Sequence, residues 1–406
     1  MTGLRVFVFL QMPQSSFPRL LGRRLRAMGH QVHKINFCGG DFLHWPWPGA
    51  CNYRQDLNTW PAFFNEFLEQ TRATDLLLIG DRRPWHQPAI GLARRRGVRV
   101  FVFDEGYVRP NFVTLEKNGV GGRSGLPRDP GLIRELAAGL PPVSPPPDLK
   151  PDIRCKVRGA VKHHFGNVVF WPLFPRYRTH RPQTVFRELT GLWPRHLTRE
   201  KRRKNDEAAL REFLADGRPY FFLPLQLPAD TQLRCYGRFV DLQEMMAEVL
   251  DSFQRRAPGE YSLVIRSHPL DWQIKSHGKF ALSLARAVGL EDRVCFVNEG
   301  DTNRMIAGSK GLVLVNSTTG LTALALGKPV FCLGEAIYAL PGLAVAGGAE
   351  ALDEFWGRPP QPDAALCRAF LSLLKDRAVT TGNYYTREGQ ALALEGCLRL
   401  LGAKEP

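Results

Sequence analysis

Arg99-Val-Phe-Val-Phe-Asp-Glu-Gly106 is the stretch that decides the fold, because an apolar run there ends in two acids and a glycine. A short apolar run that stops at a turn signal is typical of a strand buried on both faces of a parallel sheet. The pattern recurs at Ser262–Pro269 and at Gly311–Gly320, where polar residues again follow the run. Ligands of open α/β sheets bind just past the carboxyl ends of the strands, so all three polar clusters are candidate sites.

Strand and helix patterns alternate along the chain in two series. The first predicts strands at 4–10, 31–37, 75–79 and 99–103, with helices at 18–28, 60–70 and 88–96. The second predicts strands at 220–225, 262–265, 294–297, 311–315 and 330–333, with helices at 240–255, 280–288 and 319–325. Two further helices are expected at 364–375 and 387–401. Alternation of this kind predicts parallel, doubly wound sheets.

Two such series are too long for one core and predict an α/β chain of two Rossmann-like domains. We place the domains at 1–205 and 206–380, with residues 381–406 as a helix that returns to the N-terminal domain. This layout resembles the GT-B architecture of glycosyltransferases, in which two domains face a cleft. The Gly- and Pro-rich segment 120–155 is expected to be extended and largely irregular.

The formal net charge of +16 indicates anionic partners such as nucleic acid, anionic lipid or a phosphorylated substrate. Residues 176–204 carry ten Lys or Arg against two Glu, a net +8 that is half of the whole excess. Aromatic residues precede them at 165–174. Cations beside aromatic rings favour a membrane-facing segment at 156–204. A nucleic-acid groove or a solvated surface without a partner are the alternatives.

Metal and redox sites are not predicted. The eight cysteines form no Cys-x-x-Cys pair and several lie in apolar runs, which indicates reduced, buried thiols. No Asp-x-Asp occurs, and the doublet His163-His164, without acids or thiols near it in sequence, is expected at the surface. No apolar run is long enough to span a bilayer and no leader pattern is present, so we expect a cytoplasmic protein.

The cluster after residue 315 has the clearest physical reading. Asn316, Ser317, Thr318 and Thr319 end a strand and begin a helix, where free N–H groups and hydroxyls suit a phosphate. Plain helix capping is the alternative. The stretch 320–326 contains no acid, whereas UDP-sugar enzymes often place a glutamate there, so a UDP donor is not favoured.

The cluster after residue 265 offers a cation and an imidazole. Pro269 holds His268 extended at the strand tip, where it can bind a phosphate or give a proton to a leaving group. Arg266 can grip a phosphate or carboxylate with two parallel hydrogen bonds. A surface loop with an unused histidine is the alternative.

Acids complete the set. Asp104 and Glu105 are neighbours, and neighbours on a strand point to opposite faces, so one of them is expected to face the site. A loop that merely caps with acids is the alternative. Gln226 and Asp230 follow the first strand of the second series, in a loop stiffened by two prolines.

Together these clusters resemble a known family. Bacterial transferases that use CMP-sugars, such as sialyl- and Kdo transferases, share an acid-acid-Gly, a His-Pro and a Ser/Thr motif in this order. More closely, the chain resembles the S-type (KpsS/LipB-like) capsule polysaccharide β-Kdo transferases. The segments that carry the resemblance are Phe9–Pro13, Gly29–Asp41, Phe103–Pro110, Tyr177–Arg181, Pro224–Gln226 and Ser317–Leu321.

The resemblance implies transfer of Kdo from CMP-Kdo to a phosphatidylglycerol-type lipid, which starts the poly-Kdo linker of a capsular polysaccharide. It implies an N-terminal acceptor domain, a C-terminal donor domain and no metal or other cofactor. It places the chain on the inner face of the bacterial inner membrane, with other capsule-assembly enzymes as further partners and no nucleic acid.

Because CMP-Kdo and the family's products both carry β-linked Kdo, retention through a sugar–enzyme ester is expected. Asp230 is our candidate nucleophile and Glu105 the base, with Asp104 as the substitute for either. The donor is expected to contact Gln226, Arg266, His268, Pro269, Asn316, Ser317, Thr318 and Thr319. The acceptor phosphate is expected to contact Arg109, Arg178 and Arg181.

Two other functions stay open at this point. A sialyl- or other CMP-sugar transferase of the same architecture would differ in donor choice. A non-catalytic scaffold that binds membrane or polyanion through residues 176–204 would bind with a steep salt dependence and would not respond to changes at His268 or Glu105.

Overall fold

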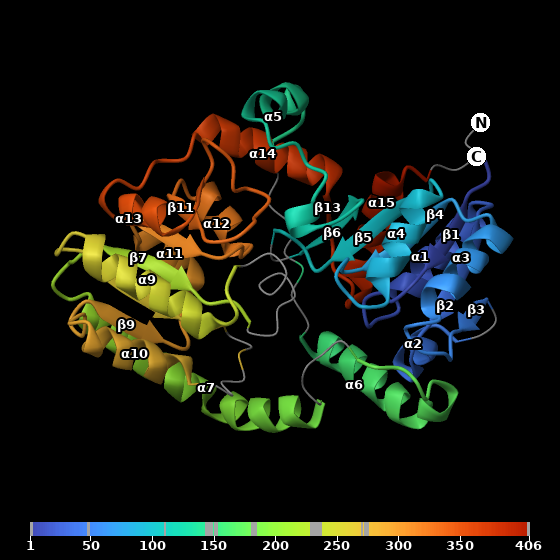
Figure 1. Ribbon diagram of the computed structural model, residues 1–406, viewed down its shortest axis with the longest axis horizontal. Helices are drawn as coiled ribbons and strands as arrows, with labels where there is room; N and C mark the ends of the chain where they lie inside the picture. The colour runs from blue at the N-terminus through green and yellow to red at the C-terminus, as the bar shows by residue number, and fades with distance from the viewer. Residues whose placement is uncertain are drawn as a thin grey trace. The chain divides into compact units, whose positions relative to one another are not determined.

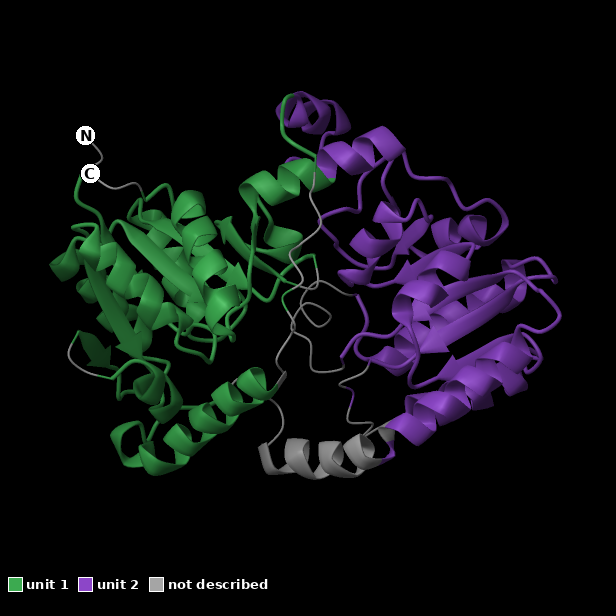
Figure 2. Ribbon diagram, turned by 180° about the vertical axis from the view of Figure 1, so that it is seen from behind, with its two compact units in different colours: residues 1–126, 139–180, 371–406 green, residues 127–138, 181–370 purple. Residues whose placement is uncertain are grey.

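The protein is described by a computed structural model (Figure 1). It covers residues 3–46, 49–108, 111–142, 149, 153–179, 185–227, 238–268, 271 and 276–403, without the side chains of residues 153, 185–197 and 199. The chain divides into two compact units, coloured separately in Figure 2. Unit 1 comprises residues 1–126, 139–180 and 371–406, and unit 2 comprises residues 127–138 and 181–370. The join predicted at residue 205 lies inside a helix that spans Val185–Phe213.

Unit 1 is built on a seven-stranded sheet with the order β13-β6-β5-β4-β1-β2-β3. The first five strands of the chain run parallel, β6 pairs with β5 in the antiparallel direction, and β13 pairs antiparallel with β6 and so runs in the direction of the first five. The strands are β1 (Val6–Phe9), β2 (Gln31–Asn36), β3 (Ala50–Asn52), β4 (Asp75–Ile79), β5 (Arg99–Asp104), β6 (Phe112–Lys117) and β13 (Val379–Thr381). The helices are α1 (Phe17–Ala27), α2 (Gly39–His44), α3 (Trp60–Thr71), α4 (His86–Arg95), α6 (Ile153–Val169) and α15 (Arg387–Leu401), with short turns η1 (Gly121–Arg123) and η2 (Trp171–Leu173).

Unit 2 is built on a six-stranded parallel sheet with the order β12-β11-β10-β7-β8-β9. Its strands are β7 (Tyr220–Pro224), β8 (Ser262–Arg266), β9 (Val294–Val297), β10 (Gly311–Leu314), β11 (Val330–Cys332) and β12 (Val345–Ala346). Its helices are α5 (Pro130–Ala137), α7 (Val185–Phe213), α9 (Leu242–Arg256), α10 (His277–Ala287), α11 (Thr302–Gly308), α12 (Thr319–Ala325) and α13 (Ala349–Gly357). Helix α14 (Ala364–Arg377) begins in unit 2 and ends in unit 1.

The apolar runs in the sequence account for the buried central strands of both sheets. Strands β1, β4, β7, β8 and β10 are buried along their whole length, as expected for parallel strands covered on both faces. Every strand and helix that the sequence analysis predicts is present. The α/β class with two Rossmann-like sheets, as in GT-B enzymes, is therefore confirmed.

The C-terminal helix α15 packs on unit 1, as predicted. It contacts β6, β13 and α1, and its Cys397, Leu398 and Leu401 join the core that contains Phe7 and Phe9. Thr386 caps the start of the helix by accepting from the Gly389 N–H at 3.1 Å. The chain therefore starts and ends in the same unit (Figure 1).

Two stretches hold more helix than expected. The segment predicted to be irregular contains α5, whose first turn holds Pro130 and whose N-cap Asp129 accepts from the Leu132 N–H at 2.7 Å. That proline–aspartate start was a readable helix signal. The basic stretch after residue 150 contains α6 and most of α7, neither of which the sequence analysis predicts.

Candidate active site

The carboxyl edge of the sheet in unit 1 carries a polar side chain after each of four neighbouring strands. Strands β2, β1, β4 and β5 lie side by side and parallel, so their carboxyl ends share one edge. Asp41, Gln11, Asp81 and Glu105 closely follow these strands. This is the edge at which open α/β sheets bind ligands.

Glu105 is the half-exposed acid of this edge. Its Oε2 accepts from Lys156 Nζ at 2.6 Å, and its Oε1 accepts from the Tyr385 hydroxyl at 2.8 Å. The Glu105 side chain remains 36% exposed, so a substrate hydroxyl can reach the carboxylate. Asp104 instead accepts from the Glu105 N–H through Oδ1 at 2.7 Å. The two partners fix the orientation of Glu105, which general acid–base catalysis requires.

Gly106 makes the turn that aims Glu105. Its φ is +104°, a conformation that residues with a side chain rarely adopt, and a Cβ there would lie 2.3 Å from the Phe112 carbonyl oxygen. The next residue, Tyr107, donates its N–H to Thr114 Oγ1 at 3.0 Å. The acid-acid-Gly motif thus folds back onto β6, where sequence reasoning expected no strand.

Glu116 on β6 is a buried acid that sequence reasoning missed. Its carboxylate accepts from the hydroxyls of Tyr107 and Ser124, and the Tyr107 oxygen in turn accepts from the Gly121 N–H at 2.6 Å. Burial raises the pKa of Glu116 to about 7, with the two hydroxyls opposing the shift. An acid inside the apolar run Phe112–Lys117 was the available signal.

A second polar cluster is buried after β1 and β2. Asp41 accepts through Oδ2 from the Phe37 N–H at 3.1 Å and from Gln11 Nε2 at 3.4 Å. Gln11 also donates to the Tyr177 hydroxyl at 3.2 Å. Cys38 Sγ accepts from the Asp41 N–H at 3.5 Å and lies 3.9 Å from His163 Nε2. The cluster unites three of the segments that carried the family resemblance.

Charges balance inside this cluster. Burial works to raise the pKa of Asp41, but the Lys34 ammonium and His163 bring it below its usual value. Burial lowers the pKa of Lys34, with Asp41 opposing the shift. Burial also lowers the pKa of His163 to about 4, so its imidazole is neutral at physiological pH. The buried aspartate is thus compensated by a lysine from the same strand–helix unit.

Cys38, Asp41 and His163 could hold a metal ion, since their ligand atoms lie within 4.8 Å of one another. A thiol must lose its proton to bind a metal. Burial and the Asp41 charge raise the pKa of Cys38 well above its usual value, and Lys34 already supplies positive charge. The donor set therefore fits a compensated polar core better than a cation site.

Helix α6 joins the two polar groups of this edge. Lys156, near its start, pairs with Glu105, and Asn167, near its end, accepts from the Gly40 N–H at 2.7 Å. His163 lies between them and is 8% exposed, so the prediction of a surface histidine at this position is wrong. Its acid neighbour Asp41 lies in α2 and its thiol neighbour Cys38 caps the start of that helix, and both are distant from His163 in sequence.

Two buried groups of unit 1 give the stability a pH dependence of opposite sign. The pKa of Glu116 is about 7 in the folded protein, whereas an unperturbed glutamate has a pKa of 4.5, so the free energy of unfolding falls as the pH rises through that window. The pKa of His163 is about 4 in the folded protein, whereas an unperturbed histidine has a pKa of 6.5, so the free energy of unfolding falls as the pH drops through that window. Each effect amounts to about 3 kcal/mol at its limit.

We expect Glu116→Gln to make the protein acid-labile, because the fall in the free energy of unfolding that His163 causes at low pH is then no longer offset. His163→Gln should do the reverse and make the free energy of unfolding fall as the pH rises from about 4.5 to about 7. Urea unfolding between pH 4 and 8 measures both slopes, with the exposed Glu69→Gln as the control that leaves the wild-type profile unchanged. Parallel profiles for all four proteins would contradict the assigned pKa values.

The carboxyl edge of the sheet in unit 2 is organised around Gln226 and Asn316. Gln226, after β7, donates Nε2 to Asn316 Oδ1 at 2.9 Å and accepts from the Asn316 N–H through Oε1 at 3.1 Å. The strands β7 and β10 are neighbours in the sheet, so this amide pair ties their ends together. Two residues that were predicted to bind the sugar donor are thus in contact, and their hydrogen bonds hold the backbone that leads to Ser317.

Ser317, Thr318 and Thr319 lead into α12. Ser317 Oγ accepts from the Thr319 N–H at 3.2 Å and donates to Thr319 Oγ1 at 3.0 Å, so Ser317 takes the capping role. Thr318 makes no side-chain capping bond, and all three residues are half-buried. The Tyr338 hydroxyl donates to the Ser317 carbonyl, and a Cβ on Gly320 would lie 2.2 Å from that hydroxyl oxygen.

The cluster after β8 is more buried than the sequence suggested. Arg266 is 7% exposed and donates to Thr302 Oγ1 at 2.6 Å. Ser267 is buried and donates to Asp271 Oδ2 at 3.4 Å, and Asp271 lies 3.8 Å from His277 Nε2. His268 is half-buried at the tip of the strand. Among the described residues of this cluster named here, His268 is therefore less buried than Arg266, Ser267 and Asp271.

Some predicted residues are not brought into either group. Arg178 lies exposed after η2 in unit 1. Asp230, Pro269, Arg109 and Arg181 lie outside the described residues. A cavity of about 420 Å³ in unit 2 is lined by residues 339–346, 360 and 361, none of which was predicted as a site residue. Among the described residues, no helix is both long and apolar enough to cross a bilayer.

Comparisons with known proteins extend over almost the whole chain. A family described as capsule polysaccharide biosynthesis protein matches residues 74–385. The chain is 30% identical over 386 residues to the capsule polysaccharide export protein KpsS of Escherichia coli, which covers 93% of this chain and 96% of that protein. It is 28% identical over 397 residues to the capsule polysaccharide modification protein LipB of Neisseria meningitidis serogroup A, covering 94% and 91%. A solved structure of Thermosulfurimonas dismutans KpsC, β-Kdo 2,7 transferase, covers 98% of both chains at 14% identity with a TM-score of 0.47.

Proposed function

The chain belongs to the capsule polysaccharide biosynthesis protein family, and from this premise we propose that it is a retaining β-Kdo transferase. It moves Kdo from CMP-Kdo to a phosphatidylglycerol-type lipid and so starts the poly-Kdo linker of a capsular polysaccharide. The observation that carries the proposal is Glu105, a half-exposed carboxylate oriented by Lys156 and Tyr385 at the carboxyl edge of a parallel sheet.

The donor binds at the carboxyl edge of unit 2 in this proposal. His268, Ser317 and Thr318 bind the CMP phosphate, and the amide pair of Gln226 and Asn316 holds the loop that presents the hydroxyls. Because Arg266 is buried and donates to Thr302, its role in this proposal is to hold the end of β8 that leads to His268. Thr319, whose hydroxyl accepts from Ser317, orients that serine.

The reaction has two displacements. The Asp230 carboxylate attacks the anomeric carbon of Kdo, the bond to the phosphate oxygen breaks, and CMP leaves. The lipid hydroxyl then attacks the same carbon, the ester bond to Asp230 breaks, and the hydroxyl proton passes to Glu105. Two inversions give net retention. Neither step needs a metal, so we propose that none is required.

In this proposal Arg109 and Arg178 of unit 1, together with Arg181, bind the lipid phosphate. The protein works on the inner face of the inner membrane beside other capsule-assembly enzymes. KpsS and LipB, by their names, act in capsule export and modification, which supports this context.

One assay tests the proposal. Purified protein is incubated with CMP-Kdo and a short-chain phosphatidylglycerol, and the lipid is read by mass spectrometry with and without EDTA. We expect a lipid one Kdo heavier in both conditions. Product from CMP-sialic acid but not from CMP-Kdo would favour the alternative of a sialyltransferase. If neither donor gives product and the protein still binds polyanions in a salt-sensitive way, the alternative of a non-catalytic scaffold would be favoured.

A further inference from the structure

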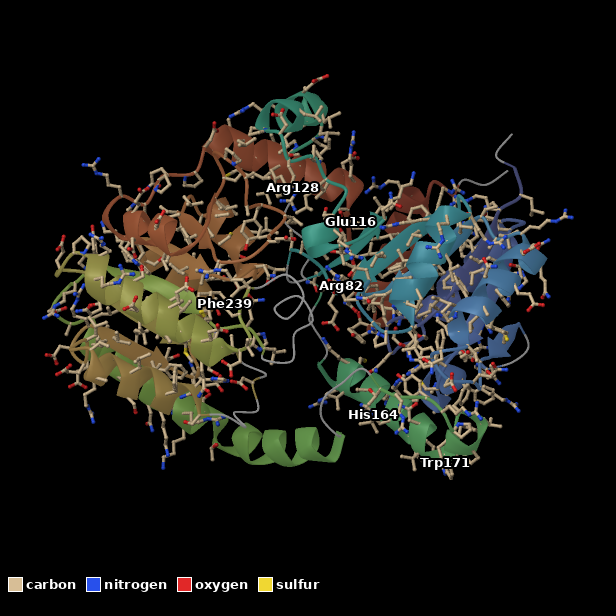
Figure 3. The ribbon with its side chains drawn as sticks, viewed as in Figure 1. Arg82, Glu116, Arg128, His164, Trp171 and Phe239 are labelled. Carbon is tan, nitrogen blue, oxygen red and sulfur yellow. The ribbon has the colours of Figure 1, made fainter. Side chains whose placement is uncertain are left out.

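Helix α6 of unit 1 presents a row of exposed apolar side chains. Val157, Val161 and Phe165 are spaced by four residues and are 53%, 54% and 61% exposed, and Val168 follows at 71%. Trp171, in the turn η2 just after the helix, is 63% exposed and is labelled at the outer end of α6 in Figure 3. Residues spaced by three and four share one helix face. An apolar row of this length on a surface marks an interaction site.

The opposite face of α6 is tightly packed, so the apolar row is not a sign of loose attachment. A Cβ on Gly159 would lie 2.2 Å from the Gln14 carbonyl oxygen, and one on Gly166 would lie 2.6 Å from the Gly39 carbonyl oxygen. Phe170 packs on Phe42 with ring centroids 5.0 Å apart. Glycines that allow such close backbone contact hold the helix in one orientation.

Cations accompany the apolar row. Arg154, Arg158 and Lys162 are exposed on α6, and the helix contains no Asp or Glu. A second copy of the same face would meet like charge, so self-association through α6 is disfavoured. Apolar side chains interleaved with cations fit the headgroup layer of an anionic bilayer, where aromatic rings lie at the interface and Lys and Arg meet lipid phosphates.

We propose that the outer face of α6 and Trp171 dock the protein flat on an anionic lipid bilayer. The inference deepens the proposed function, on whose lipid acceptor it rests. It also gives α6 a second task, because Lys156 on the same helix pairs with Glu105. The helix that lies in the headgroup layer therefore borders the candidate base, and a lipid hydroxyl reaches Glu105 without leaving the bilayer surface.

Vesicle sedimentation without CMP-Kdo tests the docking. Wild-type protein should bind vesicles of phosphatidylcholine with phosphatidylglycerol and bind pure phosphatidylcholine far more weakly. Phe165→Glu and Trp171→Glu should each lower the partition coefficient at least about tenfold. Changing Arg154, Arg158 and Lys162 to Gln should lower it on the order of 100-fold and reduce its salt dependence.

Matched controls are available in the same unit. Leu4→Glu changes an apolar side chain that is also 61% exposed, and Arg19, Arg23 and Arg95 are exposed cations on α1 and α4 for a second triple Gln variant. Both controls should bind as the wild type does. If the α6 variants bind equally well, or if binding ignores lipid charge, the docking surface is elsewhere or belongs to a protein partner.

The outcome separates the two proposals. If vesicle binding fails but Kdo reaches the short-chain lipid in solution, the docking inference falls and the transferase stands. If α6 docks the vesicles and no Kdo is transferred, the transferase proposal falls. In the case we expect, Phe165→Glu loses transfer to vesicles but keeps transfer to the short-chain lipid.

Discussion

Glu105→Gln is expected to lower the steady-state rate of lipid product formation by two to four orders of magnitude, the usual contribution of a positioned general base. The amide keeps the size of the side chain and can still accept from Tyr385, but it cannot take the proton of the lipid hydroxyl. The ion pair that it loses, with Lys156, joins side chains that are 36% and 44% exposed. Such pairs contribute at most about 1 kcal/mol, so the fold should survive.

Glu105→Gln should stop only the second displacement, and following the first displacement gives this prediction its sharpest test. Without a base the first displacement still occurs, so mixing with CMP-Kdo should release about one CMP per enzyme and then stall. Mass spectrometry of the stalled protein should find one Kdo on the peptide that contains Asp230. Glu69→Gln is the matched control, because Glu69 also forms an ion pair, with Arg96 at 2.9 Å, but on the exposed surface of α3.

Three results would count against the assignment. Unchanged turnover would remove Glu105 from the chemistry, and a similar loss in Asp104→Asn alone would transfer the role to that residue. A loss in Lys156→Gln as large as that in Glu105→Gln would indicate that the ion pair, and not the carboxylate, is what the reaction needs.

The central strands of both sheets and most of the helices between them were predictable because local sequence suffices for them, whereas the strands β3, β6, β12 and β13 were missed. The run that ends at Phe103 is apolar over its whole length, and only a strand covered on both faces buries it. The polar residues that follow such runs were equally visible. The position of Asp104, Glu105 and His268 at the carboxyl ends of strands was therefore predictable, and their roles in binding and catalysis stay predictions.

The partners of those residues were not predictable, because they come from distant parts of the chain. Glu105 is held by Lys156 and by Tyr385, which lies 280 positions away. His163 looked like a surface residue, because its neighbours Cys38 and Asp41 lie at and near the start of α2, more than 100 positions away in sequence. Helix α6 carries apolar side chains on its packed face and on its exposed face, so no single stripe distinguished it.

Asp75→Asn is expected to destabilise unit 1 by about 3–5 kcal/mol, the usual effect of removing one partner from a buried ion pair. Asp75 is fully buried at the start of β4 and accepts from Arg5 twice, from Nη2 at 2.6 Å and from Nε at 3.0 Å. Arg99 Nε and the Thr74 hydroxyl also bond its carboxylate. The asparagine keeps the shape but leaves the Arg5 guanidinium, 9% exposed, without its counter-charge.

Arg5 also donates to the Leu401 carbonyl at 2.8 Å, so the pair joins strand β4 to the end of the returning helix α15. Thermal and urea unfolding of Asp75→Asn measure the loss, and the double variant Arg5→Met with Asp75→Leu should recover most of it, because a buried pair replaced by apolar side chains of similar volume is often neutral. If Asp75→Asn unfolds as the wild type does, the ion pair of Arg5 and Asp75 is not the link that holds α15.

Asp75 lies at the amino ends of the same strands whose carboxyl ends carry Glu105, so its replacement should leave kcat per folded molecule unchanged. Opposite outcomes for Glu105→Gln and Asp75→Asn would thus assign chemistry to one edge of this sheet and stability to the other.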